Sequence, residues 1–332
     1  MLKLRPCATS LISVSVLALS SPALADFSFG RSEAAMRGLI RSYGYLLGQD
    51  YALERIAQLY PALQAPIRDA QLNFASAYGA TIMDQLSGEL TAGVGGDTFR
   101  QVAAKIKSST HDQIMSASMP YDEAVEFIAE VNNRAKGKLD GTILPYLLAT
   151  TYKGQPAAEF SADRLQRFNT QGHPKALGLN LAVALPASWG AAEVEPAHIV
   201  QKWQSMAGYG QQMITLEVHN AEAKVTQEEI KGMIDAGQLG TVAPSGSVVT
   251  AGGVQSVESL PGYWLDYTTS TERGGKTFYH AGRLNAFYTS DKAFLISCMT
   301  TADGSQKAQA QEDFKKIQAL CPLVVNSVAL KK

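Results

Sequence analysis

Apolar residues in the first half of the chain recur at the spacing of amphipathic helices. Positions i, i+3, i+4 and i+7 are apolar in successive segments, and turn residues separate these segments. This rhythm predicts an all-helical bundle of about six helices over residues 26–152. The expected helical segments run through Met36 to Leu47, Leu53 to Tyr60, Ile67 to Ile82, Phe99 to Ile106, Pro120 to Val131 and Ile143 to Leu148.

Local signals set the expected ends of these helices. Asp50 is expected to cap the second helix, and Gly93, Gly95 and Gly96 are expected to form an interhelix loop. Asp97 would cap the next helix, because its side-chain oxygen can accept the free N–H groups of a first turn. These signals predict separate helices joined by short turns.

Past residue 152 the pattern loosens and then changes its period. Glycines and prolines interrupt any helical repeat over residues 153–176, which are expected to be an interdomain linker with one helical turn. Residues 177–332 follow with the two-residue alternation of strands. The change of period predicts an α+β protein with two separate cores: a helical bundle, then a sandwich around an antiparallel sheet.

The C-terminal half is expected to contain an antiparallel meander. Short connections at Gly274 and at Ser290 separate three long strand-like runs, as in hairpins. Thr226 with Glu229 has the spacing of a capping box and opens a helix before the meander. The expected strands are Leu179 to Leu185, Met213 to Val218, Ser247 to Val257, Tyr263 to Thr271, Lys276 to Thr289 and Lys292 to Thr300, with helices at Thr226 to Ala236 and Gly304 to Leu320.

The first 25 residues differ from both halves. Lys3 and Arg5 precede an apolar run from Ala8 to Leu19, and an A-x-A tripeptide ends at Ala25. That order is typical of a cleavable signal peptide, and the run is shorter than the roughly 20 apolar residues of a membrane span. We therefore expect residues 1–25 to be removed, the mature chain to lack a membrane span, and the protein to be periplasmic or secreted.

Composition indicates a globular protein that does not bind nucleic acid. Hydrophobic residues make up 46% of the chain and charged residues 18%, which are proportions that allow a buried core. The net charge is −1, and removal of the two basic residues Lys3 and Arg5 gives −3. A nucleic-acid-binding domain would instead carry a basic stripe.

Two cysteines, Cys298 and Cys321, lie beyond the expected cleavage site. Cys298 falls in an expected strand and Cys321 ends the last expected helix, so the thiols would meet if that helix packs on that strand. In an oxidising compartment they are a candidate disulfide, worth roughly 3 kcal/mol in the chain-entropy model. Two unpaired buried thiols are the alternative.

No catalytic, metal or cofactor motif stands out. The segment at Ser245 lacks the G-x-S-x-G spacing of a hydrolase, and the glycines at 93–96 lack the strand and the Gly-Lys of a phosphate loop. The five histidines have no helical pairing, which a metal site on a helix would need. Three acidic residues, Glu123, Glu126 and Glu130, are expected to form a solvated face. The sequence therefore predicts no metal site and no cofactor.

Aromatic and basic residues gather in the expected meander. Trp264, Tyr279 and His280 lie on neighbouring strands, and Arg273 lies beside a turn. Aromatic residues and arginine are enriched at interface hot spots, so these four residues form the candidate binding site for a protein partner. Cross-strand aromatic pairs that only stabilise the sheet are the alternative.

Two motifs give the C-terminal half a family resemblance. Leu185-Pro186-Ala187-Ser188-Trp189 closes the first expected strand, and Leu260-Pro261-Gly262-Tyr263-Trp264-Leu265 enters the meander. With their element order over residues 175–325, these motifs resemble the PsbP and Mog1-like superfamily. The resemblance implies an α/β/α sandwich around an antiparallel sheet, and a role as an extrinsic subunit, assembly helper or binding adaptor. The whole chain also resembles exported bacterial proteins without an assigned function.

These patterns favour a non-catalytic periplasmic binding or assembly factor with a protein partner. One alternative is a periplasmic hydrolase whose site lies between the two halves and uses His173 or His280. Another is an immunity or inhibitor protein against a periplasmic toxin, which differs from the first hypothesis only in its partner.

Overall fold

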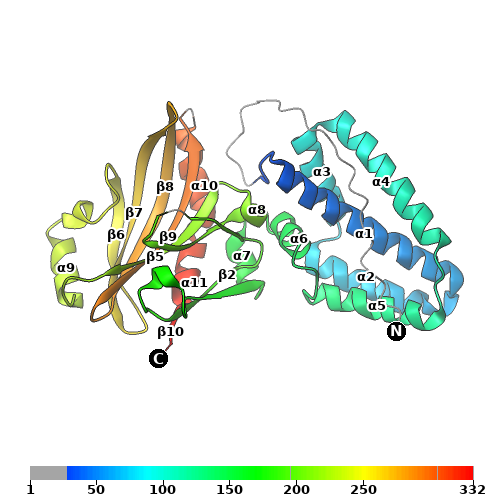
Figure 1. Cartoon of the computed structure of the whole chain (residues 1–332), viewed down its shortest axis with the longest axis horizontal. Helices are drawn as coiled ribbons and strands as arrows, with labels where there is room; N and C mark the ends of the chain where they lie inside the picture. The colour runs from blue at the N-terminus through cyan, green and yellow to red at the C-terminus, as the bar shows by residue number, and fades with distance from the viewer. Residues whose placement is uncertain (1–27, 195, 305, 332) are drawn as a thin grey trace.

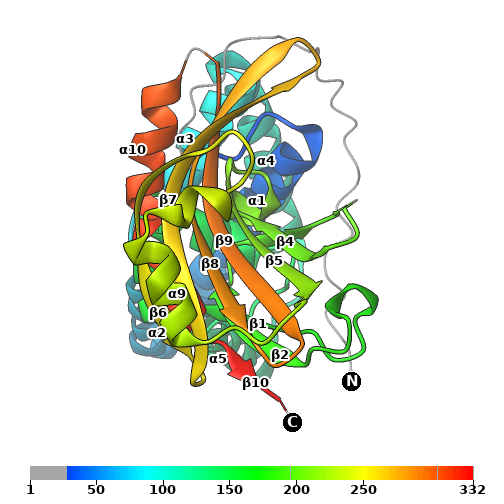
Figure 2. The same cartoon turned by 90° about the vertical axis from the view of Figure 1, so that its left-hand side faces the viewer.

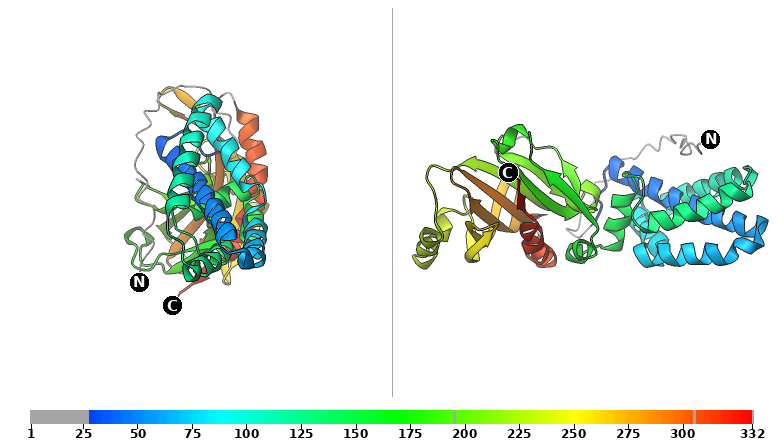
Figure 3. Two further views of the ribbon diagram at one scale, coloured as in Figure 1. Left: turned by 90° about the vertical axis from the view of Figure 1, so that its right-hand side faces the viewer. Right: turned by 90° about the horizontal axis from the view of Figure 1, so that it is seen from below.

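The computed structural model describes residues 28–194, 196–304 and 306–331. The expected signal peptide, residues 1–25, lies outside the described residues. Figure 1 shows a helical half on the right and a sheet half on the left, and Figure 3 shows the same elongated arrangement from below. Among the described residues no helix is both long enough and apolar enough to cross a membrane.

Helices fill the first half of the described chain, as expected. Their inward positions are occupied by large apolar side chains such as Leu39, Leu53, Leu86 and Leu147, which are fully buried. The elements are α1 (Glu33–Leu59), η1 (Pro61–Leu63), α2 (Gln64–Tyr78), α3 (Ile82–Val94), α4 (Gly96–Ser116), α5 (Tyr121–Ala135) and α6 (Leu144–Thr151).

The division into helices differs from the sequence prediction. The first two expected helices are the single helix α1, because Leu46, Leu53 and Ile56 lie on one buried face that continues through the expected break. Asp50 is therefore inside a helix and caps nothing. The expected third helix is also wrong at its end, since Gly79 with φ 91° stops α2 and a separate helix, α3, follows.

The expected glycine loop is much shorter than predicted. Only Gly95, with φ 87°, lies between α3 and α4, and it occupies the N-cap position expected for Asp97. Gly93 is helical and packs closely on α1, where an added Cβ would lie 2.3 Å from Met36 Sδ. Close helix packing, which a local pattern cannot show, decided where the loop lies.

The second half forms two antiparallel sheets. Within the described residues the large sheet has seven strands in the order β3-β4-β5-β9-β8-β7-β6, and the small sheet has three in the order β1-β2-β10. The α+β class and the antiparallel meander are thereby confirmed. The strands are β1 (Leu165–Asn169), β2 (Leu181–Pro186), β3 (Gly190–Ala192), β4 (Ile199–Gln204), β5 (Gln212–Asn220), β6 (Val248–Val257), β7 (Leu260–Arg273), β8 (Lys276–Tyr288), β9 (Lys292–Asp303) and β10 (Ala329–Leu330).

Helices cover both faces of the large sheet. One face packs against α10 and α11, and the other packs against α9 and η3 (Figure 2). The predicted capping box at Thr226 and Glu229 opens α9 and is confirmed. The remaining helices of this half are α7 (Pro156–Ser161), η2 (Pro174–Ala176), α8 (Ser205–Gly208), α9 (Gln227–Asp235), η3 (Gln238–Thr241), α10 (Lys307–Gln318) and α11 (Leu320–Asn326).

The segment expected to be a loose linker, residues 153–176, is ordered into α7, β1 and η2. β1 pairs antiparallel with β2 from Leu165 opposite Pro186 to Asn169 opposite Ala182. The strands β1, β3 and β4 were not predicted, because they are short and alternate weakly, so pairing with neighbours rather than local pattern makes them strands.

The two halves share one core, so the expectation of two separate cores was wrong. A continuous buried cluster runs from the helical bundle to the α10 face of the large sheet, and a second cluster lies on the α9 face. At the junction Tyr146 of α6 stacks on Phe29 with ring centroids 5.4 Å apart and approaches Tyr209 at 6.5 Å. The α8 turn reaches this junction with left-handed backbone at Met206 and Ala207.

Candidate functional site

A partly buried tryptophan lies at the centre of the α10 face of the meander. Trp264 lies on β7 opposite Asn285 of β8, and its indole covers Gly253 of β6, where a Cβ would lie 3.0 Å from Nε1. The guanidinium of Arg283 lies over the indole ring, 4.2 Å from its centroid. We call Trp264, Arg283, Asp266 and Gln318 the Trp264 platform.

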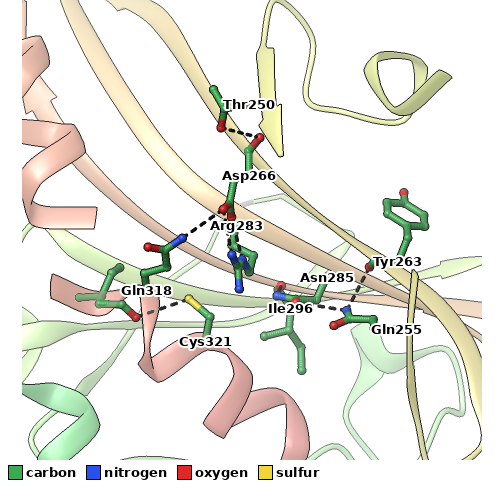
Figure 4. A network of polar contacts seen from close by, with 10 residues as sticks. Thr250, Gln255, Tyr263, Asp266, Arg283, Asn285, Ile296, Gln318 and Cys321 are labelled. Carbon is green, nitrogen blue, oxygen red and sulfur yellow. Dashed lines mark hydrogen bonds and ion pairs between the residues drawn. The ribbon is translucent and has the colours of Figure 1, made fainter. Parts of the chain in front are cut away.

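An ion pair holds the platform in place (Figure 4). Arg283 donates from Nε to Asp266 Oδ1 at 2.7 Å and from a terminal nitrogen to Oδ2 at 2.8 Å. Gln318 of α10 donates to the same Oδ2 at 3.2 Å, which ties the helix to the sheet. The hydrogen bonds to Asp266 raise the pKa of Arg283 above its ordinary value. A bidentate pair fixes the orientation of the guanidinium, and the guanidinium in turn fixes the indole.

A chain of side-chain hydrogen bonds crosses the strands beside the platform. Gln255 of β6 donates to the Tyr263 carbonyl at 3.0 Å and to Asn285 Oδ1 at 3.2 Å. Asn285 of β8 donates in turn to the Ile296 carbonyl of β9 at 2.9 Å, as Figure 4 shows. These bonds link four neighbouring strands, so the sheet below the platform is rigid.

A small cavity opens farther along the same face, between α10 and the β6–β8 strands. Its volume is about 120 Å³. Tyr279 contributes a ring to it, and Lys307 of α10 places its ammonium 5.7 Å from that ring centroid. Hydroxyl groups and one exposed valine complete much of the lining, which includes Thr268, Ser270, Gln311 and Val248. The α10 face thus offers two aromatic side chains, each beside a basic group.

The side chain of His280 points to the opposite face of the sheet, although His280 also borders the cavity. Strand alternation turns it away from its neighbour Tyr279, and its ring nitrogens lie 2.9 Å from the Thr271 hydroxyl and 3.0 Å from the Thr301 hydroxyl. Burial lowers the pKa of His280 below its ordinary value. Arg273 is exposed where β7 turns into β8, opposite Lys276.

The structure therefore brings together only part of the predicted site. Trp264 and Tyr279 share the α10 face, whereas His280 lies on the α9 face and Arg273 lies at the hairpin end. Three further aromatic residues, Tyr263, Tyr267 and Tyr288, pack into the cluster beneath α9. Each interpretation of the aromatic residues therefore describes part of the set. The three tyrosines beneath α9 stabilise the sheet, whereas Trp264 and Tyr279 reach the surface.

Sequence analysis missed the Arg283–Asp266 pair. The two residues are 17 positions apart in the chain. The register of the β7–β8 hairpin, with Asp266 opposite Arg283, brings them together. Counting back along both strands from the Gly274 turn, which was predicted, would have found this pair, because opposite residues in a hairpin share a face.

It also missed a cluster of two histidines and a carboxylate. His198 and His219 approach Glu217 Oε2 with their Nε2 atoms at 3.8 Å and 3.4 Å, and the two rings are stacked with centroids 5.3 Å apart. These side chains are well separated from the Trp264 platform by strands of the large sheet. Within the described residues no group of three His, Cys, Asp or Glu side chains is arranged to hold a metal ion.

Cys298 of β9 and Cys321 of α11 are both buried and both free in the structure. Burial, followed by the neighbouring thiol of Cys298, raises the pKa of Cys321 well above its ordinary value. The predicted packing of helix on strand thus brings the two thiols together. Their oxidation to a disulfide stays a prediction, which peptide maps with and without reductant can check.

A buried carboxylate supports the corner between β2 and β3. Glu159 of α7 is only 1% exposed and accepts from the Ser188 N–H at 2.7 Å and the Ser188 hydroxyl at 2.6 Å. Burial raises the pKa of Glu159 to about 7, and the hydrogen bonds from Ser188 partly oppose this rise. The backbone N–H of Ala207 donates to the Ser188 carbonyl at 2.8 Å, so the corner is also tied to the α8 turn.

The two histidines of the hydrolase alternative do not lie between the halves. His173 precedes η2 and approaches Phe168 of β1, with ring centroids 6.2 Å apart. His280 lies near the β7–β8 turn. At the junction the ring of Tyr146 instead contacts Phe29 and Tyr209.

Comparisons with solved structures match about half of this chain. A cyanobacterial PsbP from Synechocystis sp. PCC 6803 is 11% identical, with a TM-score of 0.34, over 51% of this chain and 93% of its own. LpqN of Mycobacterium tuberculosis, described as involved in cell envelope biogenesis, is 10% identical, with a TM-score of 0.32, over 54% and 98%. The Ran-binding protein Mog1p of Saccharomyces cerevisiae is 9% identical, with a TM-score of 0.32, over 50% and 95%.

The resemblance predicted from the sequence is confirmed as a similarity of the C-terminal half to PsbP and Mog1 structures. No family model matches the chain, and no curated protein matches it.

Proposed function

We propose that the protein is a non-catalytic binding or assembly factor of the periplasm, and that the α10 face of its sheet holds a protein partner. In this proposal residues 1–25 direct export, residues 26–152 form a helical domain, and residues 177–332 carry the binding surface. The Trp264 platform is the observation that carries the proposal.

A preorganised aromatic anchor favours binding, because little side-chain entropy is lost when a partner docks on it. Trp264 is restrained from below by Gly253 and from the side by Arg283, which Asp266 holds in turn. Tryptophan, tyrosine and arginine are the residue types that most often dominate interface energetics. Tyr279 and Lys307 extend the same surface along α10.

Recovery of a partner from periplasmic extract tests the proposal. The mature wild-type chain should retain a protein that Trp264→Ala fails to retain, while circular dichroism shows that the variant is folded. Tyr121→Ala is the matched control, because Tyr121 is an aromatic side chain, 53% exposed, on the helical half. The proposal is wrong if Trp264→Ala recovers the same partner, or if the purified chain shows turnover that one substitution abolishes without unfolding.

The identity of the partner separates an assembly factor from an immunity or inhibitor protein, since the latter would recover a toxin. A hydrolase site between the halves has no support from His173 or His280, but a hydrolase site near the β7–β8 turn has one observation in its favour: the Thr271 hydroxyl lies 2.9 Å from His280 Nε2, which is the spacing of a nucleophile and a base. Labelling of Thr271 by an activity-based probe would support that alternative.

A further inference from the structure

One end of the large sheet is a long strand whose outer edge has no neighbouring strand among the described residues. β6 is the last strand in the order of the sheet and is 10 residues long. Val248 is 65% exposed and Val254 is 41% exposed, which are high values for valine in a strand. The exposed positions of β6 also include Thr250, Ala251 and Ser256.

Such an edge is a template for strand pairing, because its outward N–H and C=O groups have no partner within the sheet. Natural edge strands are usually blocked by lysine or another charge, by proline, or by being very short. β6 contains no charged residue and no proline. Its one irregularity is a register shift between Val249 and Ala251.

Helix α9 and the short helix η3 pack on one face of β6. Leu239 of η3 lies over Gly252, where an added Cβ would lie 2.5 Å from a Leu239 methyl carbon. The side chain of Gln227 reaches the Gln255 carbonyl at 3.5 Å near one end of the strand. Val248 and Val254 lie on opposite faces of β6, and both side chains are exposed.

The structure assigns this edge to a second copy of the same chain, paired β6 to β6 across a two-fold axis. An antiparallel pair of identical strands meets no like-charge repulsion when the strand carries no charge. A two-fold interface uses one surface patch twice, so a single uncharged strand suffices to build it. The paired sheet would cover Val254 and Val248 and satisfy the outward backbone groups.

This inference does not depend on the proposed function, because strand pairing uses the backbone edge of β6, whereas the proposed partner site uses side chains of the α10 face and shares only Val248 with it. The mass of the wild-type chain, measured by light scattering or sedimentation over a concentration series, tests it directly. We expect a dimer at high concentration. Val254→Lys should raise the dimer dissociation constant by roughly tenfold or more, since each copy would then bring a charge to an edge that carries none.

Leu72→Lys is the matched control. Leu72 is 67% exposed on α2 in the helical half, so the same charge placed there should leave the dimer unchanged. Thermal melts of both variants establish that each is folded, and Ser256→Lys, at an exposed position of β6 outside the cavity, serves in place of Val254→Lys if the latter unfolds. A wild-type chain that is monomeric at every concentration overturns the inference, and so does a dimer that only Leu72→Lys disrupts.

If the wild-type chain is monomeric, hydrogen exchange with an added extended peptide shows whether β6 pairs with a different protein. If the β6 amides are protected only when the peptide is present, the edge pairs with a different chain and self-pairing is rejected.

Discussion

The two edge strands of the large sheet, β3 and β6, differ in length and in how much of each is covered. The β3 end is three residues long, and its backbone lies against the α8 turn, where a Cβ on Gly190 would lie 2.7 Å from the Ala207 carbonyl oxygen. The β6 end is 10 residues long and keeps its valines exposed. The comparison shows that length and tertiary cover, rather than strand composition, close one end of the sheet and leave the other open.

Loss of Asp266 is expected to have the largest effect on the β6 end. Asp266→Ala leaves the guanidinium of Arg283, whose side chain is 16% exposed, without its carboxylate. Removal of one partner of a buried pair costs about 3 kcal/mol or more, so urea denaturation should show a loss of that size. Glu312→Ala breaks an exposed pair with Lys315 and should cost less than about 0.5 kcal/mol. Equal losses would mean that the Asp266 pair is not a rigid support.

Glu159 makes the stability of the β3 end depend on pH. Because its pKa is about 7 in the folded protein, the folded state binds this proton more tightly than the unfolded state does. Its contribution is therefore complete below about pH 4.5 and is lost as the pH rises through about 7. The expected change is roughly 3 kcal/mol, because the pKa rises from 4.5 in the unfolded chain to about 7 in the folded protein.

Glu159→Gln should remove this part of the pH dependence, because glutamine does not ionise and keeps an acceptor for Ser188. Denaturant unfolding from pH 4 to 8 measures it, with the exposed Glu33→Gln as the control. Identical pH profiles for the wild-type chain and Glu159→Gln would show that Glu159 does not titrate in this range.

A side chain at position 190 should disrupt the packing of β3 against the α8 turn. In Gly190→Val the added carbon meets backbone atoms of Ala207 and Gly208, which cannot move without disturbing the α8 turn. Overpacking of this kind costs about 2 kcal/mol, visible as a lower urea midpoint. Ala191→Val, at the exposed next residue of β3, is the matched control and should be close to neutral. The cover by α8 would be unimportant if both variants behaved alike.

The smallest effect is expected at α9, which covers the face beside the open end. Thr226→Ala removes the hydroxyl that accepts the Glu229 N–H at 3.2 Å and should cost about 1 kcal/mol. Thr226→Ser keeps the hydroxyl and should retain most of the stability. Hydrogen exchange of the α9 amides would locate the loss, and an increase spread over the helical half instead would contradict a local cap.

Local patterns predicted the elements whose signals lie within a few residues. The turn at Gly274 and the alternation on both sides of it gave the β7–β8 hairpin, and Thr226 with Glu229 gave the start of α9. Short strands such as β3 and β4 were not predicted, because pairing with neighbouring strands, and not their local sequence pattern, makes them strands. The break expected at Asp50 failed because a residue that often caps helices does not by itself interrupt one.

Of the candidate site, sequence reasoning found Trp264 and Tyr279 on one surface but also placed His280 there. Neighbouring residues in a strand point to opposite faces, so the side chains of Tyr279 and His280 point apart even though both residues border the cavity. The partner groups that define the platform, Arg283 and Asp266, required the hairpin register.

The sequence by itself determined the class of fold, because a 3.6-residue and a two-residue apolar period each require a different backbone geometry. It also determined the candidate aromatic residues of the meander. Only the tertiary structure decided that both halves share one core, that Arg283 holds Trp264, and that β3 is covered while β6 is open. These features depend on contacts between residues distant in the chain, which no local period encodes.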